Sequence, residues 1–401
     1  MLWINFLHFY QPANIESYKI KEALDKSYSR LVRLMEEHQE LKMTWNISGC
    51  LWERFADAGE NDFIRRVKLL AASGRLELVS SAAYHALLPL VPVAETVRQI
   101  KENETILKKY LGSNFKARGF FLPEMAYSPE VAVAVKKAGY DWIIVDEGIF
   151  PAGQKPDSSH HYRDRASGLS VIFRNRRLSS AYPPDQLLAI SQDSKNNKGV
   201  YITATDAELY GLRHQDPTAE MEKIVALPIT QTLTISEYLD SLSGPVEELE
   251  LRAGTWESSE ADISQGRAYE LWSGHRNLIQ RDLWKLARLA LKAGAAATAD
   301  SNFFWYRWHL VRGLASCTFW WASGRDFSND FGPYAWSPDD IERGLDDLVR
   351  SVRSLNSPDS LANKLKVEKY YLKIKKRIWR EHWRKHWPKI RQISPHNEKY
   401  E

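Results

Sequence analysis

Cysteine is scarce in this sequence, and long apolar runs are absent. The 401 residues include only 2 cysteines, Cys50 and Cys317, so at most one disulfide can form and a disulfide framework is excluded. No apolar run approaches the length of a membrane span. Residues 1–6 lack the basic region and the cleavage site of a signal peptide, so we expect a soluble, cytoplasmic protein.

A large net charge is also lacking. The formal net charge is +4, and Lys and Arg are concentrated between Lys366 and Arg391. We therefore expect no general attraction to nucleic acid. Aromatic residues, in contrast, make up 12% of the chain and include 15 Trp. Trp and Tyr rings fill protein cores, but they also stack on sugar rings, so this composition mildly favours a carbohydrate ligand.

Short apolar runs alternate with amphipathic stretches of helical spacing over residues 1–270. The expected strands lie at residues 2–8, 42–47, 76–80, 117–122, 142–145, 169–173, 199–204 and 231–235. Strands that alternate with helices predict a parallel sheet with helical crossovers, and therefore an α/β fold. The number of strands favours an open or incomplete barrel over a doubly wound sheet, and no Gly-rich phosphate-binding loop follows the first strand.

Residues 271–390 show helical patterns without intervening strands, at 278–293, 302–320 and 341–355. We expect a C-terminal helical domain with a basic, Trp-rich end, followed by a disordered tail at 391–401. In the basic end, apolar residues recur at helical spacing, which favours a last helix whose apolar edge packs against the rest of the chain. The residues of this edge are Leu372, Ile378, Trp379 and Trp383. A contact with an anionic membrane or with nucleic acid is the alternative.

Two apolar runs of strand type end abruptly in an acid. Glu124 follows residues 119–123 (GFFLP), and Asp206 follows residues 200–205 (VYITAT). In a barrel of parallel strands, the C-terminal strand ends meet on one face, where active sites lie. A pair of carboxylates on that face supplies what glycoside hydrolysis requires. For Glu124, the structural alternative is an ion pair with Arg118.

Other polar side chains lie at or beyond the expected strand ends and offer donors and acceptors for sugar hydroxyls. The candidate substrate-binding residues are His8, Gln11, Glu77, His85, Asp146, Glu208 and Trp256. Asp146 also forms a rival acid pair with Glu147, and Glu208 is an alternative to Asp206 as the acid. A metal site of His8, His85 and Asp146 is a further alternative. Their spacing matches no metal-binding motif, so no metal and no cofactor are expected.

Five short segments, in this order, resemble the motifs of glycoside hydrolase family 57. They are residues 8–12 (HFYQP), 74–77 (GRLE) continuing to 84–90 (YHALLPL), 119–124 (GFFLPE), 206–211 (DAELYG) and the weaker 255–260 (TWESSE). The resemblance implies an incomplete (β/α)7 barrel with a C-terminal helical region. It also implies that Glu124 is the nucleophile and Asp206 the acid/base of a retaining mechanism. Many members carry a second His where this chain has Tyr10.

The resemblance therefore predicts a glycosidase of the α-amylase or 4-α-glucanotransferase type. Its substrate would be an α-linked glucan or oligosaccharide, cleaved through a glycosyl-enzyme intermediate by two carboxylates about 5–5.5 Å apart. The alternatives are an α-galactosidase or other α-glycosidase, a catalytically inactive carbohydrate-binding relative, and a metal-dependent sugar deacetylase. An oligo- or polysaccharide is the expected partner, and the sequence does not determine the oligomeric state.

Overall fold

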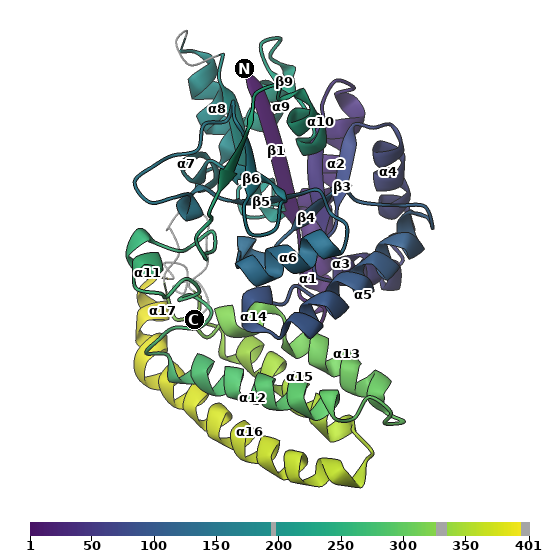
Figure 1. The fold of residues 1–401 in the computed structure, drawn as a ribbon, viewed down its shortest axis with the longest axis vertical. Helices are drawn as coiled ribbons and strands as arrows, with labels where there is room; N and C mark the ends of the chain where they lie inside the picture. Colours follow the sequence, from purple (N-terminus) through teal and green to yellow (C-terminus); the bar gives the residue numbers. More distant parts are fainter. Residues whose placement is uncertain (194–197, 326–334, 394–401) are drawn as a thin grey trace, which may run out of the picture. The chain divides into compact units, whose positions relative to one another are not determined.

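The computed structural model describes residues 1–193, 198–325 and 335–393 (Figure 1). The chain divides into two compact units, Met1–Ala268 and Tyr269–Glu401. Most of the expected disordered tail, residues 394–401, lies outside the described residues. No described helix has both the length and the apolar character that a bilayer crossing requires.

Parallel strands surround the centre of the first unit (Figure 1). In spatial order they are β8 (Val200–Asp206), β1 (Leu2–Phe9), β2 (Met43–Ile47), β3 (Leu76–Val79), β4 (Gly119–Phe121), β5 (Trp142–Asp146) and β7 (Ser170–Arg174). A parallel bridge between Ser80 and Phe120 joins β3 to β4. At the other seam, the backbone N–H of Asn175 donates to the carbonyl of Ile202 at 2.8 Å. The strands therefore curl into a barrel whose β7–β8 seam is incompletely paired.

Two segments depart from the predicted strands. Residues 231–235 contribute only β9 (Gln231–Thr232), which pairs with the start of β1. The strand stops there because Thr234 and Glu237 form a capping box that begins α10 (Ile235–Ser241). Residues 151–165, which lie outside the predicted strands, contain β6 (His161–Asp164). This strand pairs antiparallel with β7 and parallel with β10 (Val246–Leu249).

Helices lie between the strands of the first unit, and one more, α11, follows the last strand. They are α1 (Ser17–Ala23), α2 (Ser29–Glu37), α3 (Gly49–Asp57), α4 (Asn61–Ala72), α5 (Val93–Leu111), α6 (Pro129–Lys137), α7 (Arg176–Ser179), α8 (Pro183–Ser191), α9 (Glu220–Ala226) and α11 (Glu260–Ser264). Their amphipathic pattern fits this position: α4 buries Phe63, Ile64, Val67 and Leu70 on one face. Ser128 accepts a hydrogen bond from the N–H of Val131 and so caps α6, as expected for a Ser-Pro start.

The barrel interior is an apolar core. Ile4 and Phe6 of β1 pack with Phe121, Ile144 and Ile202 from other strands, since alternate residues of each strand point inward. Further along β1 in the same alternation comes His8, and polar residues begin there. The polar site is therefore confined to the C-terminal ends of the strands.

The second unit consists of helices (Figure 1). They are α12 (Leu278–Ala295), α13 (Phe303–Gly313), α14 (Ser316–Trp320), α15 (Pro338–Ser354), α16 (Leu361–Glu381) and α17 (Trp387–Ile393). The single helix predicted at 302–320 is interrupted, because Ala315 adopts an extended conformation with ψ of 137°. The side chains of Val367, Ile374 and Ile378 on α16 are buried.

The predicted apolar edge of α16 is only partly covered. Ile378 is buried, and the indole N–H of Trp379 donates to Glu342. Leu372 and Trp383, however, are 66% and 57% exposed. The prediction that these two side chains pack against the chain is therefore wrong. Helical spacing indicates that they share a face, but it cannot indicate which face the other helices cover.

This difference predicts unequal effects of two alanine substitutions on α16. Ile378→Ala is expected to lower the free energy of unfolding by about 2–5 kcal/mol, because it leaves a cavity in a packed interior. Leu372→Ala is expected to change it by less than about 0.5 kcal/mol, since that side chain is mostly in water. Urea denaturation of the two variants measures both values. Equal losses would contradict the burial pattern described for α16.

Candidate active site

Side chains from several strands meet at the C-terminal end of the barrel. His8 on β1 lies opposite Asp206 on β8 in the parallel register. Glu124 lies in the turn directly after β4, and His85 lies in the segment that follows β3. The sequence-predicted acids Glu124 and Asp206 therefore belong to the same face of the barrel.

Glu124 is held by its backbone and by an indole. Its φ of 60° lies in the left-handed region, which a non-glycine residue rarely adopts. Trp256 donates from Nε1 to Glu124 Oε2 at 2.8 Å, and pairing between Tyr127 and Gly254 brings the Trp256 segment alongside. The Glu124 side chain keeps 16% exposure, so one indole hydrogen bond orients the carboxylate while solvent still reaches it.

Backbone strain is concentrated around this carboxylate. Five described non-glycine residues have positive φ, and three of them are His85, Glu124 and Met125. Such conformations cost free energy and persist only where surrounding contacts enforce them, which is why they cluster at functional sites.

A histidine pair lies beside Glu124. His8 Nε2 and His85 Nε2 are 2.9 Å apart, and His8 Nδ1 is 2.9 Å from Asn46 Oδ1. The Asn46 amide nitrogen donates to the carbonyl of Val79 at 3.2 Å, so its oxygen must be the acceptor for His8. His8 therefore carries its proton on Nδ1, and its Nε2 accepts from His85. The tautomers are thus assigned from the hydrogen-bond network.

Both imidazoles are neutral at pH 7. Burial lowers the pKa of His8 to about 4, an effect that the nearby Asp206 opposes. Burial is the main cause that lowers the pKa of His85 well below its ordinary value, and the positive charge that His8 acquires when it is protonated lowers it further. His85 Nδ1 lies 3.7 Å from Glu124 Oε1. The pair therefore adds directed polar groups next to Glu124 without adding positive charge.

Asp206 and Glu208 have different surroundings although one residue separates them. The Asp206 side chain is 46% exposed, and the Arg213 guanidinium donates to its Oδ2 at 2.9 Å. The chain turns after Asp206, and Glu208 is buried, where it accepts from Gln11 at 2.9 Å and from the Tyr28 hydroxyl. Burial raises the pKa of Glu208 to about 7, against the opposing charge of Arg213. Only Asp206 is therefore directly accessible to a ligand.

Two predicted site residues are engaged elsewhere. Glu77 lies toward the start of β3, where it accepts from the backbone N–H of Ser236 at 3.0 Å and from Thr44 at 3.1 Å. It thus caps the start of α10, and the structure does not bring it to the strand ends where His8 and Asp206 lie.

Asp146 ends β5 but is fully buried. Its Oδ2 accepts from Arg174 Nε at 2.7 Å, and its Oδ1 accepts from Arg176 Nε at 2.7 Å and from the N–H of Gly148 at 2.8 Å. These bonds leave little capacity for a sugar hydroxyl or a metal ion. Asp146 therefore orients two arginines near the β7 end.

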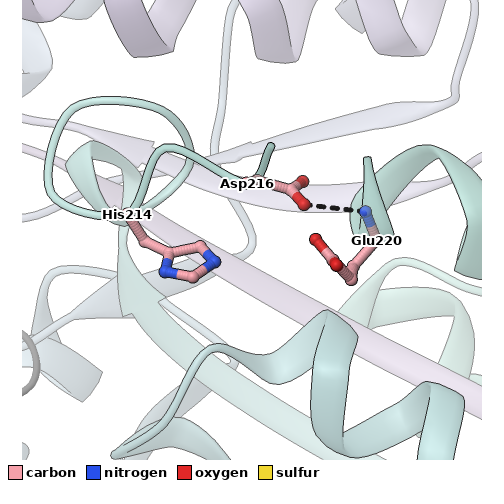
Figure 2. A group of neighbouring side chains, drawn as sticks. All are labelled: His214, Asp216 and Glu220. Carbon is pink, nitrogen blue, oxygen red and sulfur yellow. Dashed lines mark hydrogen bonds between the residues drawn. The ribbon is translucent and has the colours of Figure 1, made fainter. Parts of the chain in front are cut away.

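One described group of His and acidic side chains has its possible ligand atoms within 4.8 Å of one another: His214, Asp216 and Glu220 (Figure 2). Asp216 accepts from the Arg30 guanidinium at 2.6 Å, from the Tyr182 hydroxyl at 2.7 Å and from the N–H of Glu220 at 2.7 Å. Asp216 thus caps α9 and pairs with a cation whose charge would repel a metal ion. The group has a structural explanation, and within the described residues His8, His85 and Asp146 form no such group.

Comparisons with known proteins agree on one family. The model of glycosyl hydrolase family 57 matches residues 4–243. An alpha-amylase from Pyrococcus horikoshii is 31% identical over 176 residues, which are 42% of this chain and 27% of that protein. A 4-alpha-glucanotransferase from Thermococcus kodakarensis is 26% identical over 225 residues, 53% of this chain and 34% of that protein. The matched region therefore spans only a minor part of these relatives' length.

A solved structure extends the comparison to most of the chain. The GH57-type branching enzyme from Pyrococcus horikoshii matches with a TM-score of 0.67 at 16% identity, covering 92% of this chain and 94% of that chain. At this identity the match concerns the fold alone. The predicted fold class, a parallel α/β barrel with a C-terminal helical region, is confirmed.

Proposed function

The chain belongs to glycosyl hydrolase family 57, and we propose that it cleaves or transfers α-linked glucan by a retaining mechanism. The observation that supports this proposal is that Glu124 follows β4 and Asp206 ends β8 at the same end of the barrel, with Glu124 near His85 and Asp206 opposite His8 in the strand register. The names of the relatives, alpha-amylase and 4-alpha-glucanotransferase, support the choice of glucan.

In the proposed first step, Glu124 is the nucleophile. One of its oxygens attacks the anomeric carbon while the bond from that carbon to the leaving oxygen breaks. Because the imidazole of His85 is neutral, it forms no ion pair with Glu124 that would have to break before the carboxylate attacks. The hydrogen bond from Trp256 fixes the direction of the carboxylate without neutralising it.

Asp206 is the proposed acid/base. It gives a proton to the leaving oxygen in the first step and takes one from water or an acceptor sugar in the second. The Arg213 guanidinium donates to Asp206 Oδ2 at 2.9 Å, so the mechanism requires this contact to open when a sugar binds. Its exposed position permits such an opening, because solvent and ligand both reach the side chain.

The remaining residues have proposed supporting roles. Both ring nitrogens of His8 are bonded within the protein, so His8 is proposed to position His85 beside Glu124 rather than to bind the sugar itself. Gln11 holds the Glu208 carboxylate at 2.9 Å. Trp256 acts on Glu124 through its indole N–H rather than only as a stacking surface. The expected cytoplasmic location stays a prediction.

Purified protein is expected to release or transfer glucose units from maltooligosaccharides and to retain this activity after exhaustive chelation. The reason is that two carboxylates suffice for double displacement without a metal. The measurement is product analysis on maltooligosaccharides, aryl α-galactosides and acetylated sugars, each with and without chelator. Cleavage of the galactosides alone would favour another α-glycosidase. Deacetylation that is lost with chelator and restored by divalent metal would overturn the proposal.

A further inference from the structure

An exposed apolar stripe runs along α16, through the π-helical turn His382–His386 that follows it, and into α17; it is called the α16 stripe below. Its members recur at intervals of whole helical turns, so they lie on one face of the helix. They are Leu361, Leu365, Leu372 and Trp383, followed by Trp387 at the start of α17, with exposures of 61%, 60%, 66%, 57% and 40%. Single exposed apolar residues are ordinary, but an aligned row of this kind marks an interaction surface.

The same helix is strongly basic on its solvent side. Between residues 361 and 391, nine Lys and Arg side chains are exposed, and the two acids of this stretch, Glu368 and Glu381, are not. Glu368 is moreover neutralised by Arg353, whose Nε donates to it at 2.7 Å. Lys369, Lys376 and Arg380 border the apolar stripe in the helical wheel. This face of the helix therefore presents apolar side chains flanked by cationic ones.

The opposite face fixes the helix in place. Val367, Ile374 and Ile378 are buried, and Arg377 donates to the buried carboxylate of Asp282 at 2.7 Å. The stripe is thus a preformed surface of the folded unit, and presenting it costs no folding of a disordered segment.

We propose that this α16 stripe binds an anionic lipid surface. Leu and Trp side chains suit the boundary between headgroups and acyl chains, and flanking Lys and Arg attract anionic headgroups. A second copy of the chain would bring the same cations face to face, which is repulsive. Nucleic acid would satisfy the cations but would leave the leucines in water. The inference is independent of the proposed glucan activity.

The test is co-sedimentation of the full chain with vesicles. Vesicles of phosphatidylcholine alone are compared with vesicles of equal amounts of phosphatidylcholine and phosphatidylglycerol. We expect binding to the anionic vesicles only, weakening as NaCl rises from about 0.05 M to about 0.5 M because the screening length shortens. Leu372→Ser with Trp383→Ser, and separately Lys369→Glu with Lys376→Glu, are each expected to lower the partition coefficient by more than about tenfold.

A matched control uses exposed residues of the same types in the other unit. Lys68→Glu with Leu69→Ser changes exposed side chains on α4 and is expected to leave vesicle binding and glucan activity unchanged. Absent or equal binding to both vesicle types would overturn the proposal. The proposal would also be overturned if duplex DNA displaced the protein from the vesicles and the Leu372→Ser, Trp383→Ser variant kept its full vesicle binding. Dimerisation that this variant abolishes, with no vesicle binding, would assign the stripe to a second copy instead.

Discussion

Glu124→Ala is expected to lower kcat/KM on an α-glucan by several orders of magnitude while the fold stays intact. Double displacement has no route without a nucleophile, and the residual rate then depends on binding and on the acid alone. Initial rates of the variant and of the unsubstituted protein measure the loss. Added azide is expected to restore part of the cleavage and to give a product of inverted configuration, because a small anion can occupy the space left by the carboxylate.

The matched control is Glu130→Ala, which removes an exposed carboxylate from the first turn of α6. This variant is expected to keep full activity, since its side chain lies in solvent and takes part in none of the contacts described for the site. Thermal melting of both variants separates loss of chemistry from loss of folding. A Glu124→Ala protein that melts normally and retains near-normal turnover would remove Glu124 from the mechanism.

Asp206→Asn is expected to slow substrates with poor leaving groups far more than activated aryl glycosides. An activated leaving group needs no proton, so the rate of glycosyl-enzyme formation is expected to fall fully only with natural substrates. Rates on a maltooligosaccharide and on a nitrophenyl α-glucoside, compared in the same variant, measure this leaving-group dependence.

Glu208→Gln is the informative counterpart because Glu208 is the alternative acid. Its pKa of about 7 means that it is protonated below pH 7 and charged above. An acid with that pKa would make activity fall as pH rises through about 7. Since Glu208 is buried and bonded to Gln11, we expect Glu208→Gln to weaken activity on both substrates equally. A leaving-group dependence in Glu208→Gln and none in Asp206→Asn would exchange the two roles.

The sequence predicts the location of Glu124 and Asp206 at strand ends because the signal for it is local. An acid directly after an apolar strand stands out from the pattern, and parallel strands carry Glu124 and Asp206 to the same face without any knowledge of loops. The same rule does not identify ligand-accessible acids at two other positions. Glu77 lies inside its strand and caps α10. Asp146 ends its strand, but its oxygens accept hydrogen bonds from arginines.

The sequence pattern does not indicate several residues of the candidate site. Asn46 lies in the strand Met43–Ile47, and only the β1–β2 register shows that it sets the tautomer of His8. Tyr28 and Arg213 meet Glu208 and Asp206 from a helical segment and a loop. The strand also contains the polar residue Thr44, so polarity did not single out Asn46, and Tyr28 and Arg213 had no signal either.

The sequence by itself determined the alternation of strands and helices, the change to helices after the barrel, and the two acids at strand ends. These follow from apolar periodicity and from the high cost of burying an unpartnered charge, which act over a few neighbouring residues. Only the tertiary structure decided the His8–His85 pair, whose members are 77 residues apart, and which face of α16 remains exposed. Such contacts depend on how distant elements pack together, and a periodic pattern carries no information about the partner that covers it.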